Sequence, residues 1–352
     1  MADYPMPPRP LVQGPSAWIG AELSRRPEEW IYQFSASDLA EIEAAVAARG
    51  DRDIASITRS DFPLPTFGPV LDRIRGELPH GRGFVLMRGL PVEGRPIAES
   101  ATAFWGIGTY LGLARSQNAK GHVLGHVRDL GLATADPNVR TYQTTERQYF
   151  HTDSCDVVGL LCLKTAKQGG LSSLVSSNTI YNVMADRYPD LVGRLFQPFP
   201  TDRRGEVPEG MQPWFDTPVF NDYQGYLSAI YSGTYIRSAQ RFPEARRLTQ
   251  EDLAALDCFD SLAEDQELRL DMTLRPGDIQ FVHNHTILHD RTGFVDWPEP
   301  ERKRHLLRLW LAVPEARPLP PVYLERYGSI DIGDRGGIIC PGTKLNAPLE
   351  PV

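Results

Sequence analysis

The stretch "YFHTDSCDVVGLL", residues 149–161, decides both the fold and the chemistry of this chain. It places His151 two positions before Asp153, directly ahead of an apolar run. On extended backbone, residues i and i+2 point to the same side, so an imidazole and a carboxylate at this spacing can reach one metal ion. The apolar run predicts a buried strand. We therefore expect two metal ligands at the edge of a sheet.

The third ligand must come from elsewhere, and "GDIQFVHNHTILHDRTGF", residues 277–294, offers three histidines. His283 and His285 fall within its strand-like part, whereas His289 follows it. Two histidines and one carboxylate on one face leave three coordination positions open, as in non-haem iron(II) oxygenases. A His-x-Asp pair alone is common without a metal, and a histidine in a strand is more often structural. The interpretation therefore depends on what accompanies these residues.

Two arginines accompany them in "RKRHLLRLWLAV", residues 302–313. Arg304 and Arg308 lie four positions apart, and the strand-like segment predicts burial around Arg308. A guanidinium can bind a carboxylate through two hydrogen bonds. A dicarboxylate such as 2-oxoglutarate fits this chemistry, with its 2-oxo acid end on the metal and its far carboxylate on an arginine. The alternative is that residues 302–304 form a solvated turn and that Arg308 alone is special.

Hydroxyl groups follow a glycine pair in "QGGLSSLVSS", residues 168–177. Ser172 or Ser173 could donate a hydrogen bond to the same carboxylate. Either could equally face water on an edge strand, and the sequence leaves both readings open.

The composition bounds the class of protein. The chain has 352 residues, 23% of them charged and 41% hydrophobic, which is ordinary for a globular protein with a sizeable core. A net charge of −8 argues against nucleic acid and anionic membranes as partners. The four cysteines form no CxxC pair, so we expect reduced thiols and a cytoplasmic protein. We expect neither a signal peptide nor a membrane span, because the N-terminus is Pro-rich and no apolar run approaches about 18 residues.

Apolar periodicity predicts a mainly β fold of the α+β kind, with helical insertions and an N-terminal helical region. One helix is expected between Ser37, as its N-cap, and Gly50. Further helices are indicated over 67–78, 98–112 and 178–196, and strands over 83–90, 158–166, 169–177, 268–274, 279–285 and 305–313. Strands without regular β-α alternation exclude a doubly wound sheet and favour an antiparallel sandwich or jelly roll. We expect a Pro-rich tail over 1–15 and a single domain over 16–352.

The combination of "HTD", "KQGGLSSLVSS", "HNHTILHDRTGF" and "RHLLRLWL" resembles the taurine dioxygenase and clavaminate synthase-like group of iron(II)/2-oxoglutarate-dependent dioxygenases. The likeness runs from about residue 84 to 325. It implies a double-stranded β-helix, or jelly-roll, core with helical insertions. It also implies Fe(II) as cofactor, 2-oxoglutarate and O₂ as co-substrates, and hydroxylation of an unactivated C–H bond with release of succinate and CO₂.

Carried over by position, His151, Asp153 and His289 resemble the iron triad of this group. The group uses the open coordination positions for 2-oxoglutarate and O₂. Related halogenases lack the carboxylate and hold a halide there. The presence of Asp153 therefore favours hydroxylation, or another oxidation such as desaturation.

The anion-binding residues also have counterparts. Arg304 resembles the arginine that binds the distal carboxylate of 2-oxoglutarate, and Ser172 stands where a threonine touches that carboxylate. Arg308 matches a second active-site arginine that holds an anionic group of the substrate, and Arg291 has a supporting role. The insertion "VDWPEPE" lengthens the spacing between His289 and Arg304 relative to taurine dioxygenase. The 2-oxoglutarate role could therefore shift to Arg308.

The substrate prediction rests on polarity alone. Arg308 predicts a small, anionic molecule, with Gln117, Asn118 and His122 as further pocket groups. The segment "TYQTTERQYF" does not match the taurine pocket, so we do not predict taurine. The oligomeric state stays open, and a homo-oligomer is one outcome.

Two other functions use the same features. A zinc-dependent hydrolase can use two histidines and a carboxylate, although no HExxH pattern supplies the base that it needs. A jelly roll can also bind a small molecule without chemistry. Consumption of O₂ with formation of succinate separates the oxygenase from both.

Overall fold

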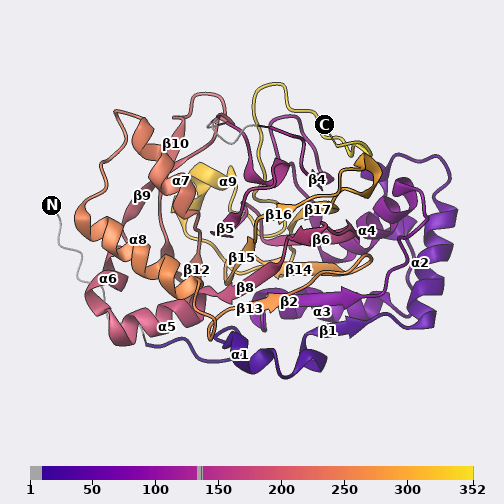
Figure 1. Cartoon of the computed structure of the whole chain (residues 1–352), viewed down its shortest axis with the longest axis horizontal. Helices are drawn as coiled ribbons and strands as arrows, with labels where there is room; N and C mark the ends of the chain where they lie inside the picture. The colour runs from indigo at the N-terminus through magenta and orange to yellow at the C-terminus, as the bar shows by residue number, and fades with distance from the viewer. Residues whose placement is uncertain (1–9, 133–135, 137, 352) are drawn as a thin grey trace.

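Two sheets face each other at the centre of the computed structural model, which describes residues 10–132, 136 and 138–351 (Figure 1). In the larger sheet the strand order is β1-β2-β14-β6-β17-β3, with β4 also paired to β17. In the smaller sheet the order is β13-β8-β15-β5. One apolar cluster contains side chains from both sheets and fills the space between them. The predicted jelly-roll core with helical insertions is confirmed.

The strands are short, and nearly all pair antiparallel. The larger sheet is built from β1 (Ile31–Gln33), β2 (Phe84–Arg88), β3 (Leu113–Ala114), β4 (Gly125–Val127), β6 (Val157–Lys164), β14 (Ile279–His283) and β17 (His305–Ala312). The smaller sheet is built from β5 (Gln148–His151), β8 (Ser172–Ser176), β13 (Leu270–Met272) and β15 (Ile287–Arg291). Separate ribbons pair β9 (Pro198–Asp202) with β10 (Trp214–Pro218), β11 (Phe220–Tyr223) with β12 (Tyr226–Ala229), and β7 (Gln168–Gly169) with β16 (Phe294–Val295). Among the described strands, β1 and β2 form the parallel pair.

Helices cover the outer face of each sheet (Figure 1). The N-terminal helices are α1 (Gly20–Leu23), α2 (Ala36–Ala48), α3 (Gly68–His80) and α4 (Ile97–Leu111). The insertion between β8 and β13 carries α5 (Ser177–Arg187), α6 (Pro189–Arg194), α7 (Gly233–Ser238) and α8 (Gln250–Ala263), and α9 (Leu324–Tyr327) follows β17. One apolar cluster joins α2, α3 and α4 to the larger sheet, and another joins α5, α6 and α8 to the smaller sheet. None of the helices in the described part of the chain combines the length and apolar character needed to cross a bilayer.

Alternation along β17 distributes its side chains between two layers. The side chains that pack toward the N-terminal helices are Leu307, Leu309 and Leu311. Leu306 and Trp310 belong instead to the cluster between the sheets. Because successive side chains on a strand point to opposite faces, Arg308 shares the inner face with Leu306 and Trp310. The interior of the jelly roll therefore contains a buried arginine.

Several predicted elements differ in their ends. Ser37 is not the N-cap of α2, because Ser35 occupies that position in a capping box with Asp38. The Ser35 hydroxyl accepts from the Asp38 amide at 3.1 Å, and the Asp38 carboxylate accepts from the Ser35 amide at 2.8 Å. An acid three residues after a serine is the signal that identifies such a cap. The alternation over 268–274 forms a strand only at Leu270–Met272.

The chain ends follow the sequence expectation in part. Residues 1–9 of the predicted Pro-rich tail lie outside the described residues. Just after them, both backbone groups of Val12 are hydrogen-bonded to the Asn182 side chain, at 2.8 and 2.9 Å. This part of the expected tail therefore lies against α5. The boundaries 16–352 for a single domain stay a prediction.

Candidate metal centre and its two cavities

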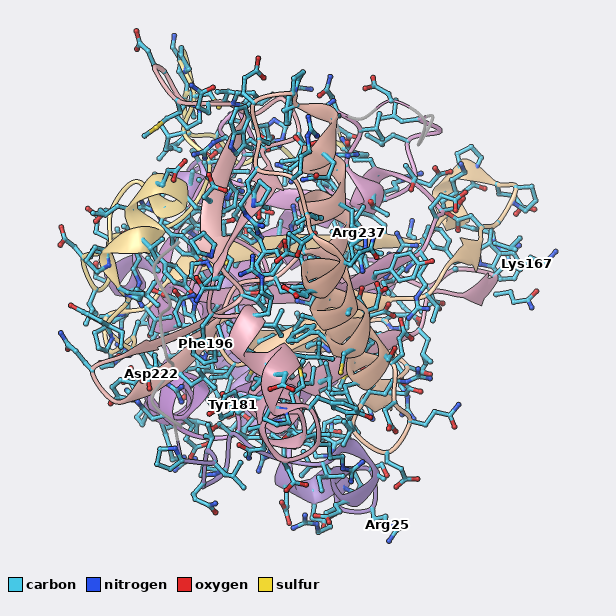
Figure 2. All side chains as sticks on the ribbon, turned by 90° about the vertical axis from the view of Figure 1, so that its left-hand side faces the viewer. Arg25, Lys167, Tyr181, Phe196, Asp222 and Arg237 are labelled. Atoms are coloured by element: carbon cyan, nitrogen blue, oxygen red, sulfur yellow. The ribbon has the colours of Figure 1, made fainter. Side chains whose placement is uncertain are left out.

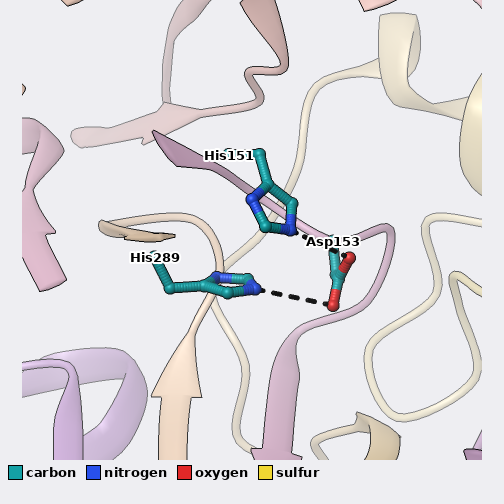
Figure 3. A group of neighbouring side chains, drawn as sticks. All are labelled: His151, Asp153 and His289. Carbon is teal, nitrogen blue, oxygen red and sulfur yellow. Dashed lines mark ion pairs between the residues drawn. The ribbon is translucent and has the colours of Figure 1, made fainter. Parts of the chain in front are cut away.

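Pairing of β5 with β15 brings His151 and His289 together. The two residues lie directly opposite each other in the antiparallel register, and their ring centroids are 4.2 Å apart. Asp153 follows β5, and its two oxygens lie 3.8 Å from His151 Nε2 and 3.8 Å from His289 Nε2 (Figure 3). One ligand atom from each of the three residues lies within 4.8 Å of the others. The three side chains that the sequence singled out therefore face one point in space.

The ionisation states suit metal binding. Burial, aided by His151, lowers the pKa of His289 to about 3, and burial also lowers the pKa of His151. Burial opposes ionisation of Asp153, but Arg308 and the two imidazoles outweigh it and hold the pKa of Asp153 below its usual value. Near neutral pH the group thus offers two neutral imidazoles and one carboxylate, the forms that bind a divalent metal.

Hydrogen bonds define which nitrogen of His151 carries the proton. Its Nδ1 lies 2.8 Å from the Tyr149 carbonyl, which can only accept, so Nδ1 carries the proton. The Gln148 amide lies 2.8 Å from Nε2, which is consistent with a lone pair on that nitrogen. The lone pair is on the side of the ring that faces Asp153. A carbonyl acceptor behind a histidine is the usual support of a metal ligand.

Three neighbours fix the orientation of Asp153. Trp310 Nε1 donates to Asp153 Oδ2 at 2.9 Å, and Arg308 Nη1 lies 3.8 Å from the same oxygen. The backbone amide of Asp153 donates to the Asn284 side chain at 3.0 Å. Trp310 stands two residues after Arg308 on β17, so both reach the carboxylate from the same inner face.

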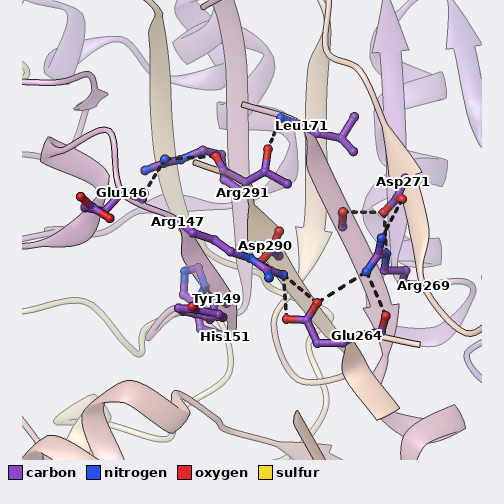
Figure 4. Close-up of polar contacts among 12 residues, drawn as sticks. Glu146, Arg147, Tyr149, His151, Leu171, Glu264, Arg269, Asp271, Asp290 and Arg291 are labelled. Atoms are coloured by element: carbon purple, nitrogen blue, oxygen red, sulfur yellow. Dashed lines mark hydrogen bonds and ion pairs between the residues drawn. The ribbon is translucent and has the colours of Figure 1, made fainter. Parts of the chain in front are cut away.

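An ion-pair network on the other face holds β5 against β15 (Figure 4). Arg147 Nε donates to Asp290 at 2.9 Å, and Arg147 Nη2 reaches Glu264 of the insertion at 2.7 Å. Asp290 is the neighbour of His289 and therefore points away from it. A register irregularity lies between His289 and Arg291 in this pair. The network thus connects the strand pair to the insertion next to the point where the ladder bends.

The first cavity lies between the triad and Arg304. Its lining includes His151, His289, Ser172 and Arg308. Arg304 is 5% exposed, burial lowers its pKa to about 10, and within the described residues no carboxylate forms an ion pair with its guanidinium. A buried cation without a counter-ion needs an anionic ligand. This cavity, with metal ligands at one end and a cation at the other, fits a dicarboxylate.

The glycine pair of "QGGLSSLVSS" makes room for this cation. Gly170 has a φ of +72°, and a Cβ there would lie 3.1 Å from Arg304 Nε. The structure also separates the two serines that the sequence left open. Ser172 lines the first cavity, whereas Ser173 donates to Asp271 at 2.6 Å on the other face of β8.

Arg291 supports the backbone before β5. Its guanidinium donates to the carbonyls of Glu146 at 2.6 Å and Thr144 at 3.2 Å. The supporting role expected for Arg291 is in keeping with these contacts. The other two histidines of the motif are fully buried, with His283 bonded to Thr286 at 2.9 Å and His285 to Asp156 at 3.0 Å.

Gln117 lies beside Arg308. Its Oε1 accepts from Arg308 Nε at 2.7 Å, and its Nε2 donates to the Arg308 carbonyl at 2.8 Å. Gly125 on β4 allows this approach, because a Cβ there would lie 2.3 Å from Gln117 Oε1. Gln117 therefore holds Arg308 both at its guanidinium group and at its backbone carbonyl.

Asn118 and His122, predicted to be pocket groups with Gln117, do not line either cavity. Asn118 Nδ2 lies 3.1 Å from His122 Nδ1, and His122 forms a β-bridge with Asn346. These side chains hold a turn against the C-terminal segment. Polarity alone could not distinguish that task from ligand binding.

A second cavity shares Tyr142, Gln148, His151 and Arg308 with the first, and Asp153 also lines it. Half of its wall comes from the core and half from the insertion. It contains three arginines that the sequence analysis missed: Arg140, Arg203 and Arg326. They come from irregular or short segments far apart in the chain, where no periodicity signals a site. Trp310 was also missed, although the sequence contained a signal for it. It lies two residues after Arg308 on a predicted strand and therefore shares the inner face with that arginine.

Comparisons with known proteins agree with this geometry. The family model described as taurine catabolism dioxygenase TauD, TfdA family matches residues 47–310. FR-33289 synthase of Streptomyces rubellomurinus is 32% identical over 321 residues, which cover 88% of this chain and 92% of that protein. Taurine hydroxylase-like protein SAT17 of Stachybotrys chartarum is 30% identical over 303 residues, covering 83% of this chain and 77% of that protein.

A solved structure shares the fold. Asparagine oxygenase in complex with Fe(II), 2S,3S-3-hydroxyasparagine and succinate superposes with a TM-score of 0.60 at 16% identity. The match covers 80% of this chain and 93% of that one. At this level of identity the likeness concerns the fold.

Proposed function

The chain belongs to the taurine catabolism dioxygenase TauD, TfdA family, and we propose that it hydroxylates an unactivated C–H bond of a small, anionic molecule. It is a non-haem iron oxygenase that depends on Fe(II), 2-oxoglutarate and O₂. The proposal rests on one observation: His151, Asp153 and His289 converge within 4.8 Å beside a cavity that ends at Arg304. Family membership also sets aside the two alternatives, a zinc-dependent hydrolase and a binding protein without chemistry.

In this proposal His151, Asp153 and His289 hold the iron. With 2-oxoglutarate and O₂, bound Fe(II) supplies the oxidant that inserts one oxygen atom into the C–H bond, while the other leaves in succinate as CO₂ is released. Trp310 and Arg308 keep the Asp153 carboxylate in place through the contacts described above. The metal thus receives its carboxylate ligand in a fixed orientation.

Arg304, with Ser172, binds the distal carboxylate of 2-oxoglutarate. The choice of Arg304 over Arg308 follows from their contacts. Arg308 already has Gln117 on Nε and Asp153 near Nη1, whereas the Arg304 guanidinium has no carboxylate partner in the described residues. Arg304 is therefore the cation that still requires an anion.

The first cavity is the proposed co-substrate cavity for 2-oxoglutarate, and the second is the proposed substrate cavity. Arg308 lines both. Its guanidinium carbon lies 4.4 Å from the ring centre of Tyr142 and 5.2 Å from that of Trp310. Both rings line the second cavity, and apolar lining of this kind would limit the access of water to the reactive site. We also propose a cytoplasmic location, because all four cysteines are free thiols.

Anaerobic titration with Fe(II) and 2-oxoglutarate tests the site. We expect a visible charge-transfer band for the wild-type chain, no band for His151→Ala or Asp153→Ala, and an unchanged band for the control His80→Ala, a histidine remote from the triad. A screen of small anionic compounds that reads succinate then tests turnover. A normal band and normal turnover in the two ligand variants would show that these residues do not hold the iron.

A further inference from the structure

We propose that Arg203 and Arg326, together with Arg140, form a subsite in the substrate cavity for a doubly charged phosphoryl group, carried by a phosphate monoester or a phosphonate. The inference rests on the proposed function and names the chemical class of its substrate. It uses residues of the insertion, of α9 and of the segment before β5 that the metal chemistry does not need.

Three arginines from distant segments meet at this wall. Arg140 precedes β5, Arg203 follows β9, and Arg326 lies on α9. The guanidinium carbons of Arg203 and Arg326 lie 5.0 and 5.4 Å from the centre of one ring, that of Phe215. The ring holds both cations in place before any ligand arrives, which lowers the entropy lost on binding.

The carboxylates near Arg203 and Arg326 do not neutralise the positive charge of these two side chains. Arg203 has a fully buried side chain that donates to the backbone carbonyls of Gln212 and Glu325 at 3.1 and 2.9 Å. The Glu325 carboxylate is 3.5 Å away and 41% exposed, so water weakens that pair. Arg203 Nη1 is buried and has no hydrogen-bond partner. A buried donor of this kind is costly unless a ligand accepts from it.

Arg326 is even less neutralised. Its Nε donates to the Ser154 hydroxyl at 2.7 Å, and no carboxylate in the described residues forms an ion pair with it. Burial, with repulsion from Arg140 and Arg203, lowers the pKa of Arg326 to about 9. Guanidinium groups that repel one another in this way attract a multiply charged anion more strongly than a monoanion.

The remaining acids near this wall are already engaged. Asp202 is paired with Arg241 at 3.0 Å and accepts from the Ser238 hydroxyl. Arg140 is paired with Glu206. The pocket therefore keeps its excess positive charge at Arg203 and Arg326.

Hydroxyl groups complete the chemistry of the subsite. They line the same cavity and can donate to further oxygens, and they are those of Ser154, Thr201, Thr217, Ser232 and Tyr235. A phosphoryl dianion offers three oxygens in three directions, whereas a carboxylate offers two in one plane. Charge and the number of donors both favour the phosphoryl group.

The position of the subsite also limits substrate size. Ser154, which binds Arg326, directly follows Asp153, and adjacent Cα atoms are about 3.8 Å apart. Asp153 and the arginines of the subsite line the same cavity, so a ligand in that cavity can approach both. A small molecule held by the arginines would then present its C–H bond within the cavity that Asp153 also lines.

Calorimetric titration of the purified chain tests the subsite without iron, so its failure is distinguishable from a failure of the oxygenase proposal. The probes are methylphosphonate, methyl phosphate, methanesulfonate and acetate, at a pH where the first is a dianion. We expect methylphosphonate or methyl phosphate to bind at least about tenfold more tightly than methanesulfonate and acetate. The tighter of the two identifies the source of the phosphoryl group. Equal binding of all four probes, or none, overturns the proposal.

Variants locate the binding. Arg203→Gln and Arg326→Gln should each lower the affinity for methylphosphonate about tenfold or more. Arg326→Lys should lose less affinity than Arg326→Gln, because it keeps the positive charge. Arg25→Gln is the control, since Arg25 lies at the edge of the molecule (Figure 2). Circular dichroism shows whether each variant is folded. If a folded Arg203→Gln and a folded Arg326→Gln bind as the wild type does, the subsite is not at these arginines.

Discussion

Replacement of Trp310 by phenylalanine isolates one hydrogen bond to the metal-binding carboxylate. Trp310 is 3% exposed, and its Nε1 donates to Asp153 Oδ2 at 2.9 Å. Phenylalanine keeps an aromatic ring in the apolar cluster but has no donor. A hydrogen bond to a charged group contributes about 1.5–3 kcal/mol, and about 1.4 kcal/mol is a factor of ten in affinity. We therefore expect Trp310→Phe to weaken metal binding by about 10- to 100-fold, in the range seen for groups that orient metal ligands.

The assay is anaerobic titration of the chain with Mn(II), a stable substitute for Fe(II), read by electron paramagnetic resonance. Trp105→Phe is the matched control. Trp105 is 6% exposed and donates its indole N–H to the Ile57 carbonyl at 3.0 Å, remote from the metal centre. The control variant loses a buried hydrogen bond of similar length, so it should lose stability but keep its Mn(II) affinity.

Two results would refute this reasoning. One is an Mn(II) affinity of Trp310→Phe within about twofold of the wild type, which would mean that the bond does not orient Asp153. The other is an equal loss in Trp105→Phe, which would mean that reduced stability, not carboxylate orientation, weakens the metal. Thermal unfolding of both variants, measured beside the titration, separates these causes.

Three further predictions follow from the site and its surroundings. Arg304→Gln should raise the concentration of 2-oxoglutarate needed for half of the charge-transfer band by about tenfold or more, whereas the exposed Arg302→Gln should not; equal values for wild type and Arg304→Gln would disprove the assignment. Gln117→Leu leaves Arg308 Nε without its acceptor, so substrate turnover should fall by a larger factor than Mn(II) affinity, and an unchanged rate of succinate release would count against the positioning role. Burial lowers the pKa of His305 to about 3 from an ordinary 6.5. Between these two pH values the unfolded chain binds a proton at His305 that the folded chain does not bind. The free energy of unfolding should therefore fall as pH drops from about 6.5 toward 3, by up to about 1.4 kcal/mol per pH unit for this residue. Urea unfolding of wild type and His305→Gln at pH 7 and 5 measures this difference, and a wild-type stability as constant with pH as that of the variant would contradict it.

The chemistry of this centre could be predicted from sequence because metal ligands restrict residue type and local spacing. His151 ends β5 and Asp153 follows two residues later, and their ligand atoms converge as the i and i+2 spacing predicts. The same period along β17 places Arg308 on the inner face. The partner His289 needed more than spacing, because three histidines competed and only the register of β5 with β15 decides between them.

The arginines of the second cavity could not be predicted in this way. Arg203 and Arg326 meet on one aromatic ring only after the insertion has folded back over the core, and no local pattern encodes that path. Asn118 was predicted to be a pocket group but lines neither cavity, because a polar turn and a polar pocket have the same composition. Gln117, one residue earlier, points inward because Gly125 leaves space for its amide.

The insertion between β8 and β13 has an evolutionary consequence. None of its residues lines the cavity of Arg304 and Ser172, yet it supplies about half of the wall around Arg203. In the proposed function, mutations within this one segment alter which molecule is accepted while the residues of the metal centre stay unchanged. Enzymes with this fold can acquire new substrates when the single segment inserted between β8 and β13 changes.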